Sequence, residues 1–132
     1  MTSLDDVLAA VPFVATLGIT IDSARKDEVV GRMPYARERT TIGGAVNGGA
    51  LMALADNVGG VCAFLNLPPN SGTSTTSSST TFVRGARGEV VATSRPLHVG
   101  RTTIAVVTEI RDDQGRLVAQ TTQSQAVLQQ RA

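Results

Sequence analysis

The sequence contains few of the residue types that most often build catalytic or metal centres. Its 132 residues include one cysteine, one histidine and no tryptophan. A single cysteine, Cys62, excludes a disulfide within the chain, and with His98 as the only imidazole we expect no metal site of the His/Cys type. A Ser-His-Asp triad would also depend on His98, which lies beside a predicted turn. The chemistry is therefore expected to come from other groups.

Charge is also scarce. Only 17% of the residues are charged, the formal net charge is +1, and the arginines are scattered, so no basic stripe suggests a nucleic-acid partner. No basic segment precedes an apolar stretch at the N-terminus, so we expect no signal peptide. The longest apolar run, residues 48–67, contains Asp56, Asn57 and Asn66, which we interpret as too polar to span a bilayer. We expect a cytoplasmic protein without a membrane partner.

Aromatic side chains make up only 3% of the chain. A core of Ala, Val, Leu and Gly buries little area per residue. Burying one face against a second copy would compensate for this in so short a chain. We therefore expect a homodimer or a homotetramer.

The chain is expected to fold as one domain, residues 1–132, of the α+β class. We predict a capped helix from Leu4 that ends before Pro12, strands over 17–21 and 28–35 joined by a turn, and a loop over 36–46. Residues 73–81 are nine consecutive Ser and Thr. Because Thr favours strands and no second domain remains for a linker to reach, we interpret them as a polar strand. Three long strands follow, over 89–99, 102–111 and 117–128.

A central helix over residues 48–65 is the best supported element. Its spacing predicts an apolar face, made of Leu51, Leu54, Val58, Val61, Cys62 and Leu65. The opposite side is predicted to carry Asp56 among small residues, including Gly59, Gly60 and Ala63. Because each glycine weakens a helix by roughly 1 kcal/mol relative to alanine, we expect a partner helix or a substrate to approach the backbone there. A carboxylate in apolar surroundings is costly unless it has a use.

The helix opens with Asn47-Gly48-Gly49. A glycine-rich helix start presents bare N–H groups and a positive dipole end to an oxyanion. With Asp56 two turns further on, these residues would supply the electrophile-stabilising donor and the base or nucleophile that acyl transfer needs. The alternatives are an Asn47 that only caps the helix, glycines that only form a turn, and a surface carboxylate.

The order of elements and the 47–56 segment resemble the hotdog-fold acyl-CoA thioesterases, in particular the PaaI-like (phenylacetate-pathway) group. In that family a curved antiparallel sheet wraps around one long helix. The helix starts with His-Gly-Gly and carries an acid nine residues after the His, which corresponds here to Asn47 and Asp56. Residues 82–86 are similar to the family's aromatic–x–Arg–Pro–x segment, and Gly100-Arg101 to its Gly-Arg turn.

The resemblance implies an acyl-CoA thioesterase in which Asp56 acts as general base or nucleophile. It also implies that the Gly48 N–H polarises the thioester carbonyl and that these two groups come from different subunits. Thr75, or Ser74, would help to position the water. No metal or redox cofactor is implied, and coenzyme A enters only as part of the substrate.

Other residues are expected around the substrate. Gly49 and Thr41 would lie beside it, and Arg84 and Arg101 would contact the phosphates of coenzyme A. Two positions depart from the family pattern. Asn47 replaces the usual His. It can still donate or accept a hydrogen bond near the thioester, as a catalytic residue, but it cannot titrate near neutrality. Thr41 stands where many relatives carry Asn or Gln.

Two other functions remain open. A non-catalytic acyl-CoA-binding or sensing module on the same fold would be compatible with Thr41 and Asn47. An acyl-thioester hydratase or dehydratase typically needs a His in or near the central helix, whereas His98 is predicted on a strand. The small apolar interior indicates a medium-chain or aromatic acyl group.

Overall fold

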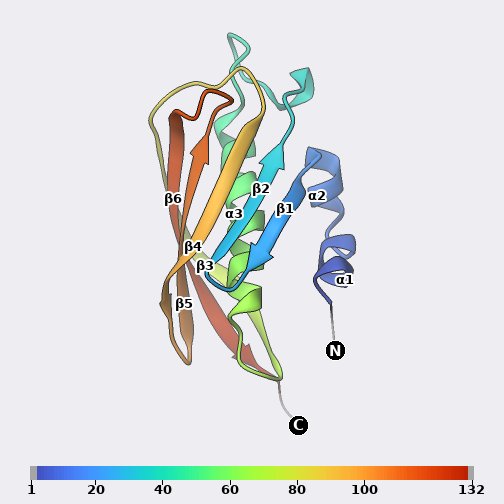
Figure 1. The fold of residues 1–132 in the computed structure, drawn as a ribbon, viewed down its shortest axis with the longest axis vertical. Coiled ribbons are helices and arrows are strands. Elements are labelled where there is room, and N and C mark those ends of the chain that lie inside the picture. Colours follow the sequence, from blue (N-terminus) through green and yellow to red (C-terminus); the bar gives the residue numbers. More distant parts are fainter. Residues whose placement is uncertain (1–2, 131–132) are drawn as a thin grey trace.

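One curved antiparallel sheet encloses one long helix in the computed structural model, which describes residues 3–130 (Figure 1). The six strands lie in the order β1-β2-β4-β5-β6-β3. Their bounds are β1 (Thr20–Arg25), β2 (Glu28–Met33), β3 (Ser71–Phe82), β4 (Val90–Val99), β5 (Thr103–Arg111) and β6 (Leu117–Gln129). The helix α3 (Gly48–Leu65) lies on the concave side of the sheet. The predicted α+β architecture is confirmed.

The N-terminal segment differs from the prediction. Two short helices, α1 (Leu4–Ala9) and α2 (Pro12–Leu17), replace the single expected helix. Ser3 and Asp6 form a capping box at the start of α1, as the predicted cap required. Pro12 opens α2 instead of only ending α1, because a missing N–H costs nothing at the first helical position.

The strand predicted over 17–21 is present and pairs with β2 as expected, but its bounds are wrong. Leu17 is the last residue of α2, and Gly18 ends that helix in the left-handed conformation with φ of 71°. Strand β1 therefore starts at Thr20 and continues to Arg25 through residues predicted as a turn. Strand β2 ends at Met33 because Pro34 follows it, and the expected loop contains a short 3-10 helix, η1 (Arg37–Arg39).

Helix α3 has the predicted bounds, but it is buried on more than one face. Leu54, Val58 and Cys62 are fully buried as expected. Gly59 and Ala63, predicted to share an approachable side with Asp56, are buried as well. The reason is the curvature of the sheet, whose strands β2 to β6 all contact α3. At Gly59 the missing side chain lets the Gln123 side chain of β6 come close to the helix.

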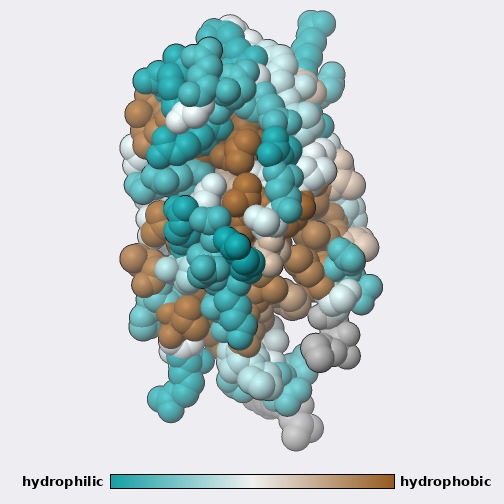
Figure 2. Space-filling model, in the orientation of Figure 1, coloured by the Kyte–Doolittle hydropathy of each residue, from teal (hydrophilic) through white to brown (hydrophobic). Residues whose placement is uncertain are grey.

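The sequence prediction that residues 48–67 are too polar to span a bilayer is not supported. The length and apolar character of α3 would allow a crossing despite Asp56 and Asn57. In this fold the apolar residues of α3 pack instead against the sheet. Some apolar surface remains, and Figure 2 shows it as separate patches between hydrophilic residues on one face of the molecule. The large apolar side chains that stay exposed include Phe13, Ile42, Phe82, Val83, Leu97 and Leu128.

Strand β3 is an edge strand. It pairs with β6 on one side, from Ser71↔Gln129 to Phe82↔Ala119, and its other side has no strand partner among residues 3–130. The predicted Ser/Thr strand is confirmed and is longer than expected. Most of its side chains are exposed, and those that point inward lie beside α3.

Candidate active site

The N-terminus of α3 presents a backbone donor. The Oδ1 atom of Asn47 accepts a hydrogen bond from the Gly49 N–H at 2.7 Å, so Asn47 is the N-cap. Gly48 is the first helical residue, and its N–H has no acceptor within the helix. Among residues 3–130 it donates to no other group. The Gly48 N–H is therefore available to an oxyanion at the positive end of the helix dipole.

The carboxylate of Asp56 is exposed, not surrounded by apolar groups as the sequence suggested. Its Oδ1 atom accepts two hydrogen bonds, from Thr75 Oγ1 at 2.9 Å and from Gln123 Nε2 at 3.1 Å. No donor among residues 3–130 reaches Oδ2. The carboxylate is thus held by one oxygen and offers the other. Of the two hydroxyl candidates, Thr75 contacts Asp56, and Ser74 is its exposed neighbour.

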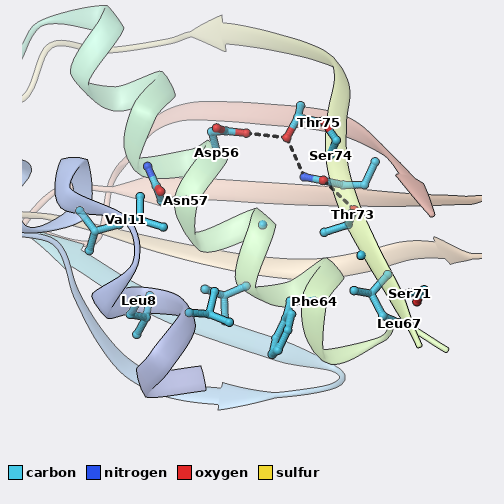
Figure 3. Close-up of a pocket in the computed structure, with 16 residues that line it drawn as sticks. Leu8, Val11, Asp56, Asn57, Phe64, Leu67, Ser71, Thr73, Ser74 and Thr75 are labelled. Atoms are coloured by element: carbon cyan, nitrogen blue, oxygen red, sulfur yellow. Dashed lines mark hydrogen bonds between the residues drawn. The ribbon is translucent and has the colours of Figure 1, made fainter. Parts of the chain in front are cut away.

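A second layer of hydrogen bonds supports Thr75. Gln125 donates from Nε2 to Thr75 Oγ1 at 2.9 Å, and its Oε1 accepts from Thr73 Oγ1 at 3.0 Å (Figure 3). Gln123 and Gln125 are 1% and 2% exposed. The hydroxyl of Thr75 is therefore oriented by a buried amide and donates its own proton to the carboxylate.

Sequence reasoning missed both glutamines. They lie two residues apart on β6, between Thr121 and Val127, and all four side chains are buried. The two-residue period of a strand is the signal that could have found them, because it places Gln123 and Gln125 on the inward face of β6. Two amides buried on the core side of a strand need partners. Asp56 accepts from Gln123 Nε2, and the hydroxyls of Thr73 and Thr75 pair with Gln125. Oε1 of Gln123 is buried without a hydrogen-bond partner among residues 3–130.

Within one chain, the Gly48 N–H and the Asp56 carboxylate are too far apart to act on the same carbonyl group. Gly48 and Asp56 are eight residues apart on the same helix, which corresponds to about 12 Å along its axis. A carbonyl oxygen that accepts from the Gly48 N–H is therefore out of reach of the Asp56 carboxylate of the same chain. A site that uses both groups needs a second copy.

The remaining predicted residues fall at two ends of the molecule. Thr41 lies in the loop before α3, where its N–H donates to Ala45 O at 2.8 Å. Arg84 follows β3 close to Phe82, whose ring lies against Gly48. Arg101 lies in the β4–β5 turn at the opposite end of the sheet (Figure 1). One chain therefore does not bring Arg84 and Arg101 together.

A cavity of about 320 Å³ opens beside Asp56. It lies between α1 and α2 on one side and α3 and β3 on the other, as Figure 3 shows. Its lining includes Ser74 and Thr75 along with apolar side chains from three helices. No group of three or more metal-ligating side chains forms anywhere between residues 3 and 130. The site therefore combines a fixed carboxylate with an adjoining, largely apolar cavity.

Comparison with known proteins identifies the family. Residues 43–119, more than half of the chain, match the model of the thioesterase superfamily. A curated relative from Deinococcus radiodurans named "Putative esterase" is 35% identical over 104 residues, which cover 77% of this chain and 65% of that protein. The chain therefore spans slightly less than two thirds of this relative's length. The chain belongs to the thioesterase superfamily.

Solved structures agree with this assignment. A thioesterase family protein from Silicibacter pomeroyi is 25% identical, with a TM-score of 0.91 and 96% of each chain covered. A thioesterase from Haemophilus influenzae shares the fold with a TM-score of 0.89 at 23% identity, covering 98% of this chain and 92% of that one. The expected hotdog fold is confirmed.

Proposed function

We propose that the protein hydrolyses acyl-CoA thioesters as a PaaI-like enzyme whose active site forms between two copies of the chain. The observation that carries this proposal is the Asp56 carboxylate, which Thr75 and Gln123 hold through Oδ1 at the opening of a largely apolar cavity. A carboxylate that only served solubility would need neither a buried amide donor nor a cavity beside it.

In the proposed reaction the thioester carbonyl oxygen accepts a hydrogen bond from the Gly48 N–H of one copy. Oδ2 of Asp56 from the other copy takes a proton from water, and the resulting hydroxide attacks the carbonyl carbon. Collapse of the tetrahedral intermediate breaks the C–S bond and releases the free acid and the thiolate of coenzyme A, which takes up the proton. Direct attack by Oδ2, followed by hydrolysis of the resulting anhydride, uses the same groups.

The free edge of β3 supports the dimer. Charged side chains and proline usually protect an exposed strand edge from pairing with another chain. Residues 71–82 contain neither. Pairing of β3 with its counterpart around a two-fold axis would extend the sheet across both copies. Such an axis makes contacts reciprocal, so a Gly48 that meets the partner's Asp56 implies a second, equivalent site.

The first test measures thiol release from a panel of acyl-CoAs by wild type and Asp56→Asn. Asparagine keeps the size of the side chain and removes the base, so we expect a loss of at least about 10²-fold in kcat. Unchanged hydrolysis in the variant would refute the mechanism. Tight acyl-CoA binding by a wild type without turnover would favour the sensing module, which Asn47 and Thr41 keep as the second candidate.

A complementation experiment tests the shared site. Gly48→Pro removes the N–H at a position where proline is tolerated, and Asn47 already has the extended backbone, with φ of −61° and ψ of 135°, that a following proline requires. Gly48→Ala is the control, because it adds a Cβ against Phe82 and keeps the N–H. Co-expressed Gly48→Pro and Asp56→Asn chains would regain about one quarter of wild-type activity, from the one intact site of each mixed dimer. A site within one chain would regain none.

A further inference from the structure

The cavity beside Asp56 is apolar over most of its wall. The apolar side chains come from α1, α2, α3 and the segments that follow α1 and α3, namely Val7, Leu8, Val11, Val14, Val61, Phe64 and Leu67. Its volume of about 320 Å³ lies at the lower end of the range of small-molecule sites, roughly 300–1,000 Å³. The cavity can thus hold a small or medium-sized apolar group.

Apart from the exposed Ser74 hydroxyl, the side-chain donors in the wall are already engaged. Asn57 Nδ2 donates to Ala53 O at 2.8 Å, and Ser71 Oγ donates to Pro68 O at 2.6 Å. The side chains of Thr73, Thr75 and Gln125 bond to one another. Asp56 is the only charged residue in the lining. A ligand group that enters therefore meets no cation and few free donors, which favours an uncharged hydrocarbon.

Gly60 is the feature that keeps this cavity open. It lies one turn beyond Asp56 on α3 and lines the cavity. A Cβ at this position would meet no atom within 4 Å, and Gly60 is not among the glycines with positive φ. Neither packing nor backbone conformation requires glycine here, although glycine weakens a helix. The missing side chain leaves its space to the cavity.

We propose that the acyl group of the substrate occupies this cavity and that Gly60 determines which acyl groups fit. This inference rests on the proposed thioesterase function. The acyl chain runs from the carbonyl beside Asp56 along α3, past Gly60, toward Phe64 and Leu67. Asp56 and Phe64 are about 12 Å apart along the helix axis. The preferred substrate is therefore an uncharged, apolar acyl thioester of medium length, and a dicarboxylic acyl group such as succinyl is repelled by Asp56.

The test compares kcat/KM for butanoyl-, octanoyl-, dodecanoyl- and succinyl-CoA in wild type, Gly60→Ala and Gly60→Leu. Octanoyl-CoA should be the preferred substrate of wild type, and succinyl-CoA should be the poorest. Gly60→Leu should lower kcat/KM for octanoyl-CoA by about tenfold or more and change butanoyl-CoA by less than about threefold. Gly60→Ala should give a smaller loss in the same direction. Ala9→Leu is the matched control, because it adds the same side chain to the exposed side of α1.

Binding to the Asp56→Asn variant separates the two proposals. Calorimetry with octanoyl-CoA should show binding to Asp56→Asn that weakens when Gly60→Leu is added. If wild type hydrolyses these thioesters and Gly60→Leu slows all chain lengths equally, the cavity does not hold the acyl group and only this inference is overturned. If wild type does not hydrolyse any acyl-CoA and Asp56→Asn does not bind any, the proposed function fails, and this inference fails with it.

Discussion

Gly59 leaves room for the side-chain amide of Gln123. A Cβ at position 59 would lie 1.9 Å from Oε1 and 2.8 Å from Cδ of Gln123. Gln123 is almost fully buried, and the Nε2 atom of the same amide donates to Asp56 at 3.1 Å. The glycine pair in the middle of α3 thus has two separate roles, because Gly59 admits a strand side chain and Gly60 faces the cavity.

The substitution Gly59→Ala should lower both stability and activity. The added methyl group displaces Gln123, which costs about 1–3 kcal/mol of overpacking and weakens the hydrogen bond to Asp56. Gly60→Ala is the control for stability. It makes the same change one residue later without a clash and should raise the free energy of unfolding by about 1 kcal/mol through helix propensity. Urea unfolding of both variants measures the contrast. Equal effects would show that Gln123 does not depend on Gly59.

The hydrogen bond from the Thr75 hydroxyl to Asp56 should contribute to kcat. Thr75→Val keeps the shape of the side chain and removes the donor, and a hydrogen bond to a charged group contributes about 1.5–3 kcal/mol. We expect kcat to fall about 10- to 100-fold, with Thr75→Ser retaining most of the activity. Thr20→Val, an exposed change on β1, controls for the loss of a hydroxyl. A fully active Thr75→Val would show that Gln123 alone positions the carboxylate.

Asn47 should contribute to stability as an N-cap. Asn47→Ala removes the acceptor of the Gly49 N–H and should cost about 0.5–2 kcal/mol, whereas Asn47→Ser keeps a capping oxygen and should cost less. Thermal unfolding measures both. Measurements of activity test the second role predicted for Asn47, a hydrogen bond to the substrate. If Asn47→Ser is as stable as wild type but slower, the amide Nδ2 acts on the substrate in addition to the cap.

The thiol of Cys62 should be unreactive in the native protein. Burial, with a smaller effect of the Asp27 carboxylate, raises its pKa to about 11. The thiolate is the reactive form, so iodoacetamide at pH 8 should label the protein only in denaturant. The native pKa lies above that of the unfolded chain, about 8.5. The stability that the neutral thiol contributes is therefore complete below about pH 8.5 and is lost as pH rises toward 11. Cys62→Ala should show a weaker decline of stability over this range. An identical decline would contradict the assignment.

The sequence predicts those parts of the molecule that local chemistry determines. The bounds of α3 follow from the Asn47 cap and the spacing of Leu51, Leu54 and Val58, and the last three strands follow from their alternation and turns. The second N-terminal helix was missed because Pro12 is compatible with both ending and starting a helix. The environment of Asp56 could not be predicted in the same way. It depends on the curvature of the sheet, which brings β6 behind the helix and places Gln123 against Gly59, and no local pattern encodes that distance.

The last prediction concerns the free edge of β3. If the active site needs the partner's Gly48, then breaking the dimer should abolish activity without altering the Asp56 network of each chain. The double substitution Ser77→Glu and Ser79→Glu places two exposed carboxylates on β3. Four like charges would then meet where two copies of the strand pair, and like charges across paired strands are destabilising.

We expect this variant to sediment as a folded monomer with an unchanged circular dichroism spectrum and at least about 10²-fold lower kcat. The matched control is Thr20→Glu with Ser23→Glu, which adds the same charge to exposed positions of β1 at the opposite edge of the sheet. The control should keep both its mass and its activity. A β3 variant that is monomeric and fully active would show that one chain contains the whole site. A dimeric, active variant would show that the copies meet elsewhere.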